Sequence, residues 1–266
     1  MDLISLLKTI QKNGIRIHYD ADFKGTCPIG SSKIGGQPDL PVDFEWYYFE
    51  GEAFDGTITN RPLSFLAQID CEEASNFDKE SVLPKKGMLY FFYELETMTW
   101  GLASEDKNSA KVYHYSGDKS KLKRIDFPSD LLDEYRLPEM PISFSSKIEL
   151  PSFVEFSEHF EIAKDVVWDD FEEISYKLTG ETDEIVELAN GGVNKLVGYA
   201  NIIQNDMLIE FKEDTSEWRL LFQLDSIVTK NYELLWGDSG RIYFYVNSDD
   251  LANLNFDNCW LFLQCY

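Results

Sequence analysis

Residues 65–71 read FLAQIDC, and residues 221–226 return to the same pattern as LFQLDS. Two other landmarks recur in the same order along the chain. They are KIGG at 33–36 with KLVG at 195–198, and GMLYF at 87–91 with GRIYF at 240–244. The paired landmarks lie 162, 155 and 153 residues apart. Two copies are too few for a solenoid, so the sequence predicts one pseudo-symmetric globular domain.

Each copy of the repeat carries a Gln-x-Asp pair on one face of a predicted strand. Residues two apart share a face, so Gln68 and Asp70 point away from the apolar row of their strand, and so do Gln223 and Asp225. Two interpretations are open. The pairs could line one groove across the pseudo-twofold axis and offer amide and carboxylate groups to a ligand. Alternatively, they satisfy buried backbone groups in the adjoining turns.

The segment from Trp236 to Gly240, WGDSG, is the most site-like turn of the chain. A tryptophan beside glycines and a carboxylate could stack on a ligand while Asp238 holds one of its donors. Ordinary turn chemistry also explains the segment, because an aspartate accepts from the backbone amides ahead of it and glycine permits positive φ. Trp236 and Asp238 therefore join the two Gln-x-Asp pairs as ligand-binding candidates.

Together these motifs resemble the YwqG-like family over residues 10–266. The matching stretches are SKIGGQPDLP at 32–41, PLSFLAQID at 62–70, LPKKGMLYFF at 83–92, LFQLD at 221–225 and WGDSG at 236–240. The resemblance implies a bacterial, β-rich protein of one duplicated domain with no established reaction, and some relatives look like members of toxin–immunity gene neighbourhoods. The family's second glycine motif, His-x-Leu-Gly-Gly-Tyr-Pro, has Asn194, Val197 and Ala200 at its His, first Gly and Pro positions. No role of that histidine or proline carries over.

Composition describes a folded cytoplasmic protein. Of the 266 residues, 44% are hydrophobic and 15% aromatic, which is enough to build a core. No apolar run reaches the eighteen or so residues of a membrane span. Apolar residues at helical spacing follow Asp2, which predicts an amphipathic helix closed by Asn13 and Gly14 rather than a signal peptide. Four cysteines without C-x-x-C spacing and three scattered histidines favour no disulfide, metal or cofactor.

The chain is strongly acidic, and its acids are unevenly placed. With 24 basic and 48 acidic residues the net charge is −24, which argues against nucleic acid and membrane surfaces as partners. Residues 155–187 hold twelve acids and two lysines, a surface that would speed encounter with a basic protein. The candidate contacts are Asp169, Asp170, Glu172 and Glu173, with Trp168 or Tyr176 as anchors. A solvated helical face is the plainer explanation.

Strands outnumber helices and no βαβ rhythm appears, so the sequence predicts an α+β, β-rich fold with mostly antiparallel sheets. Helices are expected at the N-terminus and near residues 72–77, 158–178, 182–189 and 248–253. In the second copy, strands are expected near residues 207–211, 219–225, 241–246 and 259–265. Residues 1–266 are expected to co-fold as a single domain. Its parts are copy one at 15–115, a connector at 116–157, a helical segment at 158–190 and copy two at 194–266.

The sequence contains no G-x-G-x-x-G, G-x-S-x-G or H-E-x-x-H motif. The favoured interpretation is a non-enzymatic cytoplasmic binding protein with a basic protein partner, of the toxin-immunity type that the resemblance implies. The alternative is a binder of a small molecule or peptide, or an enzyme. Its groove would be lined by Gln68, Asp70, Gln223, Asp225, Trp236 and Asp238. The sequence predicts neither a specific ligand nor an oligomeric state.

Overall fold

The computed structural model describes residues 2–181, 193–210 and 218–266. Its centre is one ten-stranded sheet in which neighbouring strands are antiparallel. Across the sheet the order is β16 (Trp260–Cys265), β15 (Gly240–Asn247), β12 (Trp218–Asp225), β11 (Lys195–Leu196), β1 (Lys12–Tyr19), β10 (Met140–Glu149), β2 (Lys33–Ile34), β6 (Ser64–Asp70), β7 (Met88–Tyr93) and β8 (Ala110–Tyr115). Smaller pairs join β13 (Ile227–Val228) to β14 (Glu233–Leu234), β3 (Asp39–Leu40) to β9 (Lys123–Arg124), and β4 (Tyr48–Glu52) to β5 (Ile58–Pro62).

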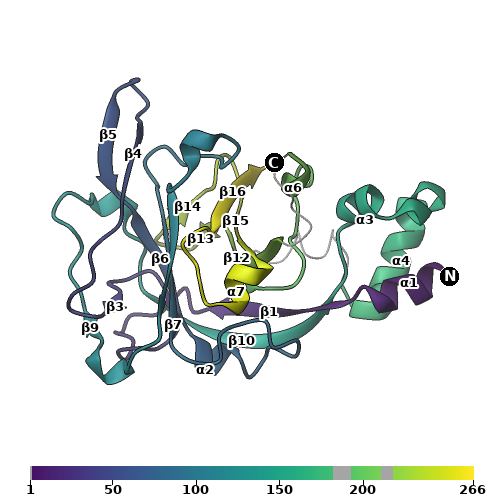
Figure 1. Ribbon diagram of the computed structural model, residues 1–266, viewed down its shortest axis with the longest axis horizontal. Helices are drawn as coiled ribbons and strands as arrows, with labels where there is room; N and C mark the ends of the chain where they lie inside the picture. Colours follow the sequence, from purple (N-terminus) through teal and green to yellow (C-terminus); the bar gives the residue numbers. More distant parts are fainter. Residues whose placement is uncertain (1, 182–192, 211–217) are drawn as a thin grey trace.

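The sheet is arranged symmetrically about its two central strands, β1 and β10. These pair from Lys12 opposite Glu149 to Tyr19 opposite Ile142, and they form the long ribbon at the base of the molecule in Figure 1. β11 adds to β1 on one side, and β2 adds to β10 on the other. Each is followed outward by a Gln-x-Asp strand (β12 or β6), a Tyr-Phe strand (β15 or β7) and an edge strand (β16 or β8). The two copies of the repeat therefore form the two halves of the sheet.

Both halves contribute side chains to one apolar core. The ring of Phe91 on β7 lies 4.4 Å from that of Phe222 on β12 and 5.2 Å from that of Phe244 on β15, measured between centroids. The sheet is nearly closed, because its edge strands β16 and β8 approach each other. The Leu263 amide of β16 also donates, at 3.1 Å, to the carbonyl of Trp100 in the loop between β7 and β8. Each large apolar side chain buried here contributes about 1.5–3 kcal/mol. The interior thus joins the halves that the repeat separates in sequence.

Three helices form a second, smaller cluster at the far ends of β1 and β10, on the right of Figure 1. They are α1 (Leu3–Thr9), α3 (Phe153–His159) and α4 (Trp168–Thr179), packed around Leu7, Phe156 and Phe171. α4 ends at Gly180, whose φ of 77° suits a left-handed cap. Elsewhere in the described residues the helices are α2 (Cys71–Ala74), α6 (Met207–Glu210) and α7 (Ser248–Ala252), with 3₁₀ turns at Ser104–Asp106, Lys119–Lys121, Asp133–Tyr135 and Glu161–Asp165.

The structure confirms the predicted α+β, β-rich fold with antiparallel sheets. Two local predictions are wrong. Residues 207–210 form α6 instead of a strand, because a short apolar run does not distinguish the two. Gly14 does not end the first helix; it lies inside β1, where a Cβ would sit 2.3 Å from the Cδ of Glu149. The helix expected at 182–189 lies outside the described residues.

Candidate functional site

Gln68, on β6, is fully buried and holds two backbone segments: Asp39, the first residue of β3, and Ser31, in the loop that precedes β2. Its Oε1 accepts from the Asp39 amide at 2.8 Å. Its Nε2 donates to the Ser31 carbonyl at 2.8 Å and to Oδ2 of Asp39 at 2.8 Å. All three of these hydrogen bonds join Gln68 to residues of its own half of the fold.

Gln223, on β12, makes the same three bonds in the second half. Its Oε1 accepts from the Asn201 amide at 2.9 Å, and its Nε2 donates to the Val193 carbonyl at 2.6 Å and to Oδ1 of Asn201 at 3.2 Å. Asn201 and Val193 stand 162 residues after Asp39 and Ser31, the same offset that separates the two lysine motifs. We call these two arrangements the glutamine clamps.

A tyrosine reinforces each clamp from the neighbouring strand. The Tyr90 hydroxyl on β7 donates to the Asp39 carbonyl, and the Tyr243 hydroxyl on β15 donates to the Asn201 carbonyl at 2.8 Å. Burial raises the pKa of both phenols well above the usual value. Buried polar groups need hydrogen-bond partners. In each half, the backbone groups that the glutamine and the tyrosine bond therefore explain why these two polar side chains are buried.

The aspartates that follow the glutamines have different surroundings. Asp70 caps α2 by accepting from the Glu72 amide at 3.0 Å, and it pairs with Lys119 at 2.8 Å. Asp225 is buried and pairs with Arg241 at 2.8 Å. The two Gln-x-Asp pairs bond separately within their own halves. The expected convergence of these side chains in one groove is therefore not what the structure has.

Trp236 and Asp238 are also separated by the fold. Trp236 is completely buried in the shared core, with its ring centroid 5.9 Å from that of Tyr93, so its faces are not open to a ligand. Asp238, two residues later, is exposed at the turn. The tryptophan serves the core, and the stacking role expected for it has no geometric basis here.

A buried lysine accompanies each clamp, and sequence reasoning had treated both lysines only as repeat landmarks. Lys33, opposite Gln68, pairs with Glu139 at 2.9 Å, and Lys195, opposite Gln223, pairs with Glu149 at 2.9 Å. The two carboxylates come from opposite ends of the β10 region. Burial lowers the pKa of Lys195 to about 8, although Glu149 opposes the shift.

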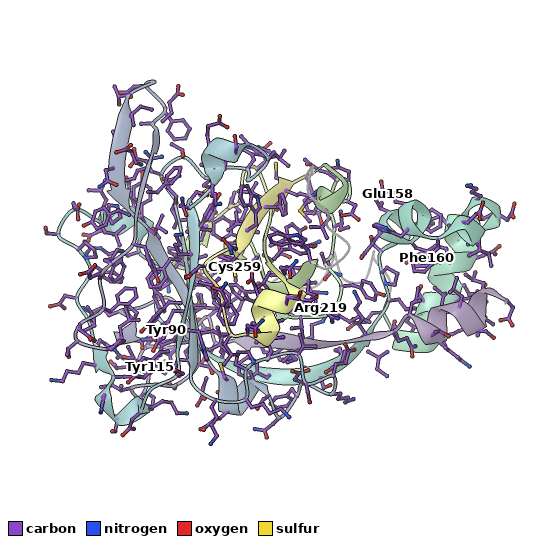
Figure 2. The ribbon with its side chains drawn as sticks, in the orientation of Figure 1. Tyr90, Tyr115, Glu158, Phe160, Arg219 and Cys259 are labelled. Carbon is purple, nitrogen blue, oxygen red and sulfur yellow. The ribbon has the colours of Figure 1, made fainter. Side chains whose placement is uncertain are left out.

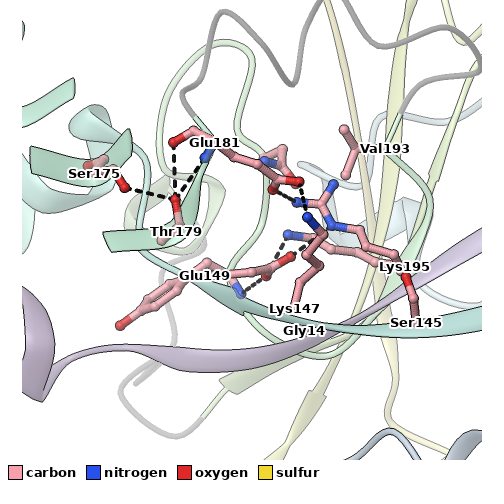
Figure 3. A network of polar contacts seen from close by, with 12 residues as sticks. Gly14, Ser145, Lys147, Glu149, Ser175, Thr179, Glu181, Val193 and Lys195 are labelled. Atoms are coloured by element: carbon pink, nitrogen blue, oxygen red, sulfur yellow. Dashed lines mark hydrogen bonds and ion pairs between the residues drawn. The ribbon is translucent and has the colours of Figure 1, made fainter. Parts of the chain in front are cut away.

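Figure 3 shows the network around Lys195 and Glu149. Glu149 also accepts from the Tyr199 amide at 3.2 Å and lies 3.2 Å from Nε of Arg16. Arg16 also forms an ion pair with Glu181 at 2.7 Å. The cavity beside this network has a volume of about 40 Å³, which suits water rather than an organic ligand. The network is best understood as the buried polar seam between β1, β10, β11 and α4.

The three histidines lie at three separate places. Nε2 of His18 lies 2.8 Å from the Ser145 hydroxyl, and Nε2 of His114 lies 3.2 Å from the Lys86 carbonyl. Nε2 of His159 lies 2.6 Å from the Asp206 carboxylate. Within the described parts of the chain, no three His, Cys, Asp or Glu side chains gather as a metal site. The four cysteines are free there.

The acidic residues of α4 divide between its two faces. Asp169, Asp170 and Glu173 are exposed, whereas Glu172 is buried at 7% exposure and lines the polar seam with Ser175. Asp169, Glu173 and Tyr176 follow one another at helical spacings of four and three, so they form one outward stripe. Tyr176 is 54% exposed, and Glu173 forms an ion pair with Lys177. Glu172 thus does not belong to the outward face.

A family model described as a domain of unknown function, DUF1963, matches residues 32–265. The chain belongs to this family. No curated protein matches the chain. The DUF1963 match starts after β1, although β1 is one of the two central strands and pairs with both β10 and β11.

The DUF1963 match contains both clamp glutamines, both buried lysines and α4, and it begins one residue after the clamp partner Ser31. In the described residues of this family member, no helix is long and apolar enough to cross a bilayer. The clamp partners Asp39 and Asn201 were missed by sequence reasoning. Their signal was present in the 162-residue offset, which extends from the lysines to the loop residues six positions later.

Proposed function

We propose that this DUF1963 chain is a YwqG-like, non-enzymatic cytoplasmic binding protein that contacts a basic protein partner through the outer face of α4. The observation that carries the proposal is the outward stripe of Asp169, Glu173 and Tyr176. It combines two carboxylates with a half-exposed aromatic ring. In protein interfaces, charge sets the encounter rate and aromatic side chains supply anchors.

The position of α4 supports this use. The helical cluster projects from the sheet, and Figure 2 places Glu158 and Phe160 there, far from Tyr90 and Tyr115 of the first half. Trp168 and Val167 at the start of α4 are 46% and 61% exposed, which adds apolar surface beside the acids. A partner can reach this face without disturbing the shared core.

The hydrogen bonds of the two glutamine clamps also favour a surface-binding role. The side-chain amides of Gln68 and Gln223 are already bonded to backbone groups, and Trp236 is enclosed in the core. A groove lined by these residues therefore has no geometric support. A role as an immunity-type inhibitor of a basic toxin is the specific form of the proposal, and it rests on the family resemblance together with the acidic face.

The test begins with capture of partners from lysate of the source cells by the immobilised protein, at low and at moderate salt. A captured basic protein is then purified, and its association rate is measured by surface plasmon resonance. Reversing the charges of Asp169, Asp170 and Glu173 to lysine should reduce that rate by about tenfold or more, and added salt should reduce it further. Glu172 is left unchanged because it is buried.

A matched control reverses three exposed acids of the first half, Glu45, Glu50 and Glu52, and keeps the same net charge. The control should retain more of the association rate than the α4 variant. Tyr176→Ala should mainly speed dissociation, because an anchor acts after encounter. If the association rate did not change with salt, and fell equally in the α4 variant and in the control variant, α4 would be ruled out as the docking face.

A further inference from the structure

A cavity of about 170 Å³ lies in the first half, away from both the clamps and α4. It is enclosed by the end of β5 with the start of β6, the turn after β7, and the loop that enters the 3₁₀ turn Asp133–Tyr135. Its apolar lining comprises Pro62, Leu95, Leu131, Leu132 and Tyr135, and its polar lining comprises Arg61, Ser64, Glu94, Glu96 and Asp130. The size is close to that of engineered cavities that bind benzene, which are about 150 Å³.

The lining of this cavity contains a single unsatisfied hydroxyl, that of Ser64. Ser64 is 1% exposed, and its Oγ has no hydrogen-bond partner among the described residues. A buried hydroxyl can both donate and accept a hydrogen bond, and leaving it unpaired is unfavourable. The site therefore offers a ligand one buried hydroxyl as a polar contact.

The other buried polar pair in the lining is already satisfied. Arg61 donates from Nε to Glu94 at 2.8 Å and from its remaining nitrogens to Thr59 at 2.6 Å and Thr97 at 3.1 Å. Glu94 also accepts from the Glu96 amide at 2.7 Å. Arg61 and Glu94 hence form a neutral, fixed wall and leave no free charge for a ligand.

Two further carboxylates stand at the open end. Glu96 is 36% exposed and lies 4.0 Å from the Arg61 guanidinium, whose charge Glu94 already balances. Asp130 is exposed and accepts from the Tyr48 hydroxyl at 3.1 Å. The mouth of the cavity consequently carries negative charge, and the Tyr135 ring in its wall also favours a cation.

We propose that this cavity binds a small organic cation with an apolar body and a hydroxyl at its far end. The ammonium would lie between Glu96 and Asp130, the body against Leu95, Leu131 and Tyr135, and the hydroxyl would bond with Oγ of Ser64. The cavity admits a benzene-sized body with a short side chain. This site is independent of the protein-binding face on α4.

The experiment uses three probes of one shape in isothermal titration calorimetry with the full chain: tyramine, phenethylamine and 4-hydroxyphenylacetate. Tyramine should bind most tightly, phenethylamine about three- to tenfold more weakly because it lacks the hydroxyl, and 4-hydroxyphenylacetate most weakly because its charge is reversed. Absence of binding by both amines, or equal binding by the amines and the acid, would overturn the proposal.

Variants locate the site. Ser64→Ala should weaken tyramine about three- to tenfold and leave phenethylamine unchanged, which a merely structural effect would not do. Glu96→Gln combined with Asp130→Asn should weaken both amines about tenfold. The matched control Asp43→Asn with Glu45→Gln removes the same charge outside the cavity and should have a smaller effect. Tyramine binding that is as strong in both the Ser64 and the carboxylate variants as in the wild type would place the ligand elsewhere.

Discussion

The two glutamine clamps hold the same backbone, but they differ in where the charge lies. Beside Gln68 the clamp partner is Asp39, which pairs with Arg124 at 2.9 Å. Beside Gln223 it is the neutral Asn201, and the buried carboxylate belongs instead to Asp225, which pairs with Arg241. Both halves keep the buried glutamine amide, but the acid of the ion pair lies at a different position in each half. The difference indicates that the glutamine serves the fold, whereas the position of the acid is adjustable.

The largest expected effect separates the halves by one isosteric change. Gln68→Glu removes the donor to the Ser31 carbonyl and places a second carboxylate against Asp39, so we expect a loss of about 3–5 kcal/mol of unfolding free energy. Gln223→Glu faces the amide of Asn201, which can present a donor instead, and we expect about 1–3 kcal/mol. Urea unfolding at neutral pH measures both.

The acidity of the medium sharpens this comparison. The introduced carboxyl at position 68 should be neutral at low pH, so the gap between the two variants should narrow as the pH falls toward 4. Gln11→Glu, outside both clamps, is the control for added charge. Equal losses from the two clamp variants at every pH would mean that Asp39 does not distinguish the halves.

A smaller effect is expected from exchanging the loop residues. Asp39→Asn leaves Arg124 with Glu139 at 3.5 Å and the Cys27 carbonyl, and we expect a loss of about 2 kcal/mol. Asn201→Asp adds an acid near Asp225 that Arg241 must share, and about 1 kcal/mol should be lost. Thermal unfolding with Asp22→Asn as an exposed control tests this. If Asp39→Asn had no effect, the relocated ion pair would carry no stability.

The repeat made the fold class and the equivalence of Gln68 with Gln223 predictable, because strand periodicity and landmark order are local signals. The clamp partners were harder to find. Gln68 bonds a loop 29 residues upstream and Gln223 one 22 residues upstream, and strand periodicity does not say where a loop returns. The groove hypothesis failed for this reason: the free capacity of each amide is used within its own half.

Other misassignments have similar causes. Asn13-Gly14 has the composition of a helix end, but both residues pair with β10 as part of β1. Glycine suits position 14 there because a Cβ would lie 2.3 Å from Cδ of Glu149. Trp236 has turn neighbours typical of a site, yet its ring is enclosed by core residues from the other half, such as Tyr93. In each case a contact distant in sequence outweighs the local pattern.

The smallest expected effect concerns the lysines behind the clamps. Because burial lowers the pKa of Lys195 to about 8 from 10.5, the unfolded chain binds more protons than the folded chain between these values. The penalty of burying the charge is fully present below pH 8 and is relieved as the pH rises toward 10.5. Relative to Lys195→Met, the wild type should therefore gain about 1 kcal/mol of unfolding free energy between pH 7 and pH 9.

Chemical unfolding at both pH values measures the change, with Lys8→Met as the exposed control. A constant difference between wild type and Lys195→Met would show that Lys195 does not release its proton in this range, and the ion pair with Glu149 would then outweigh burial.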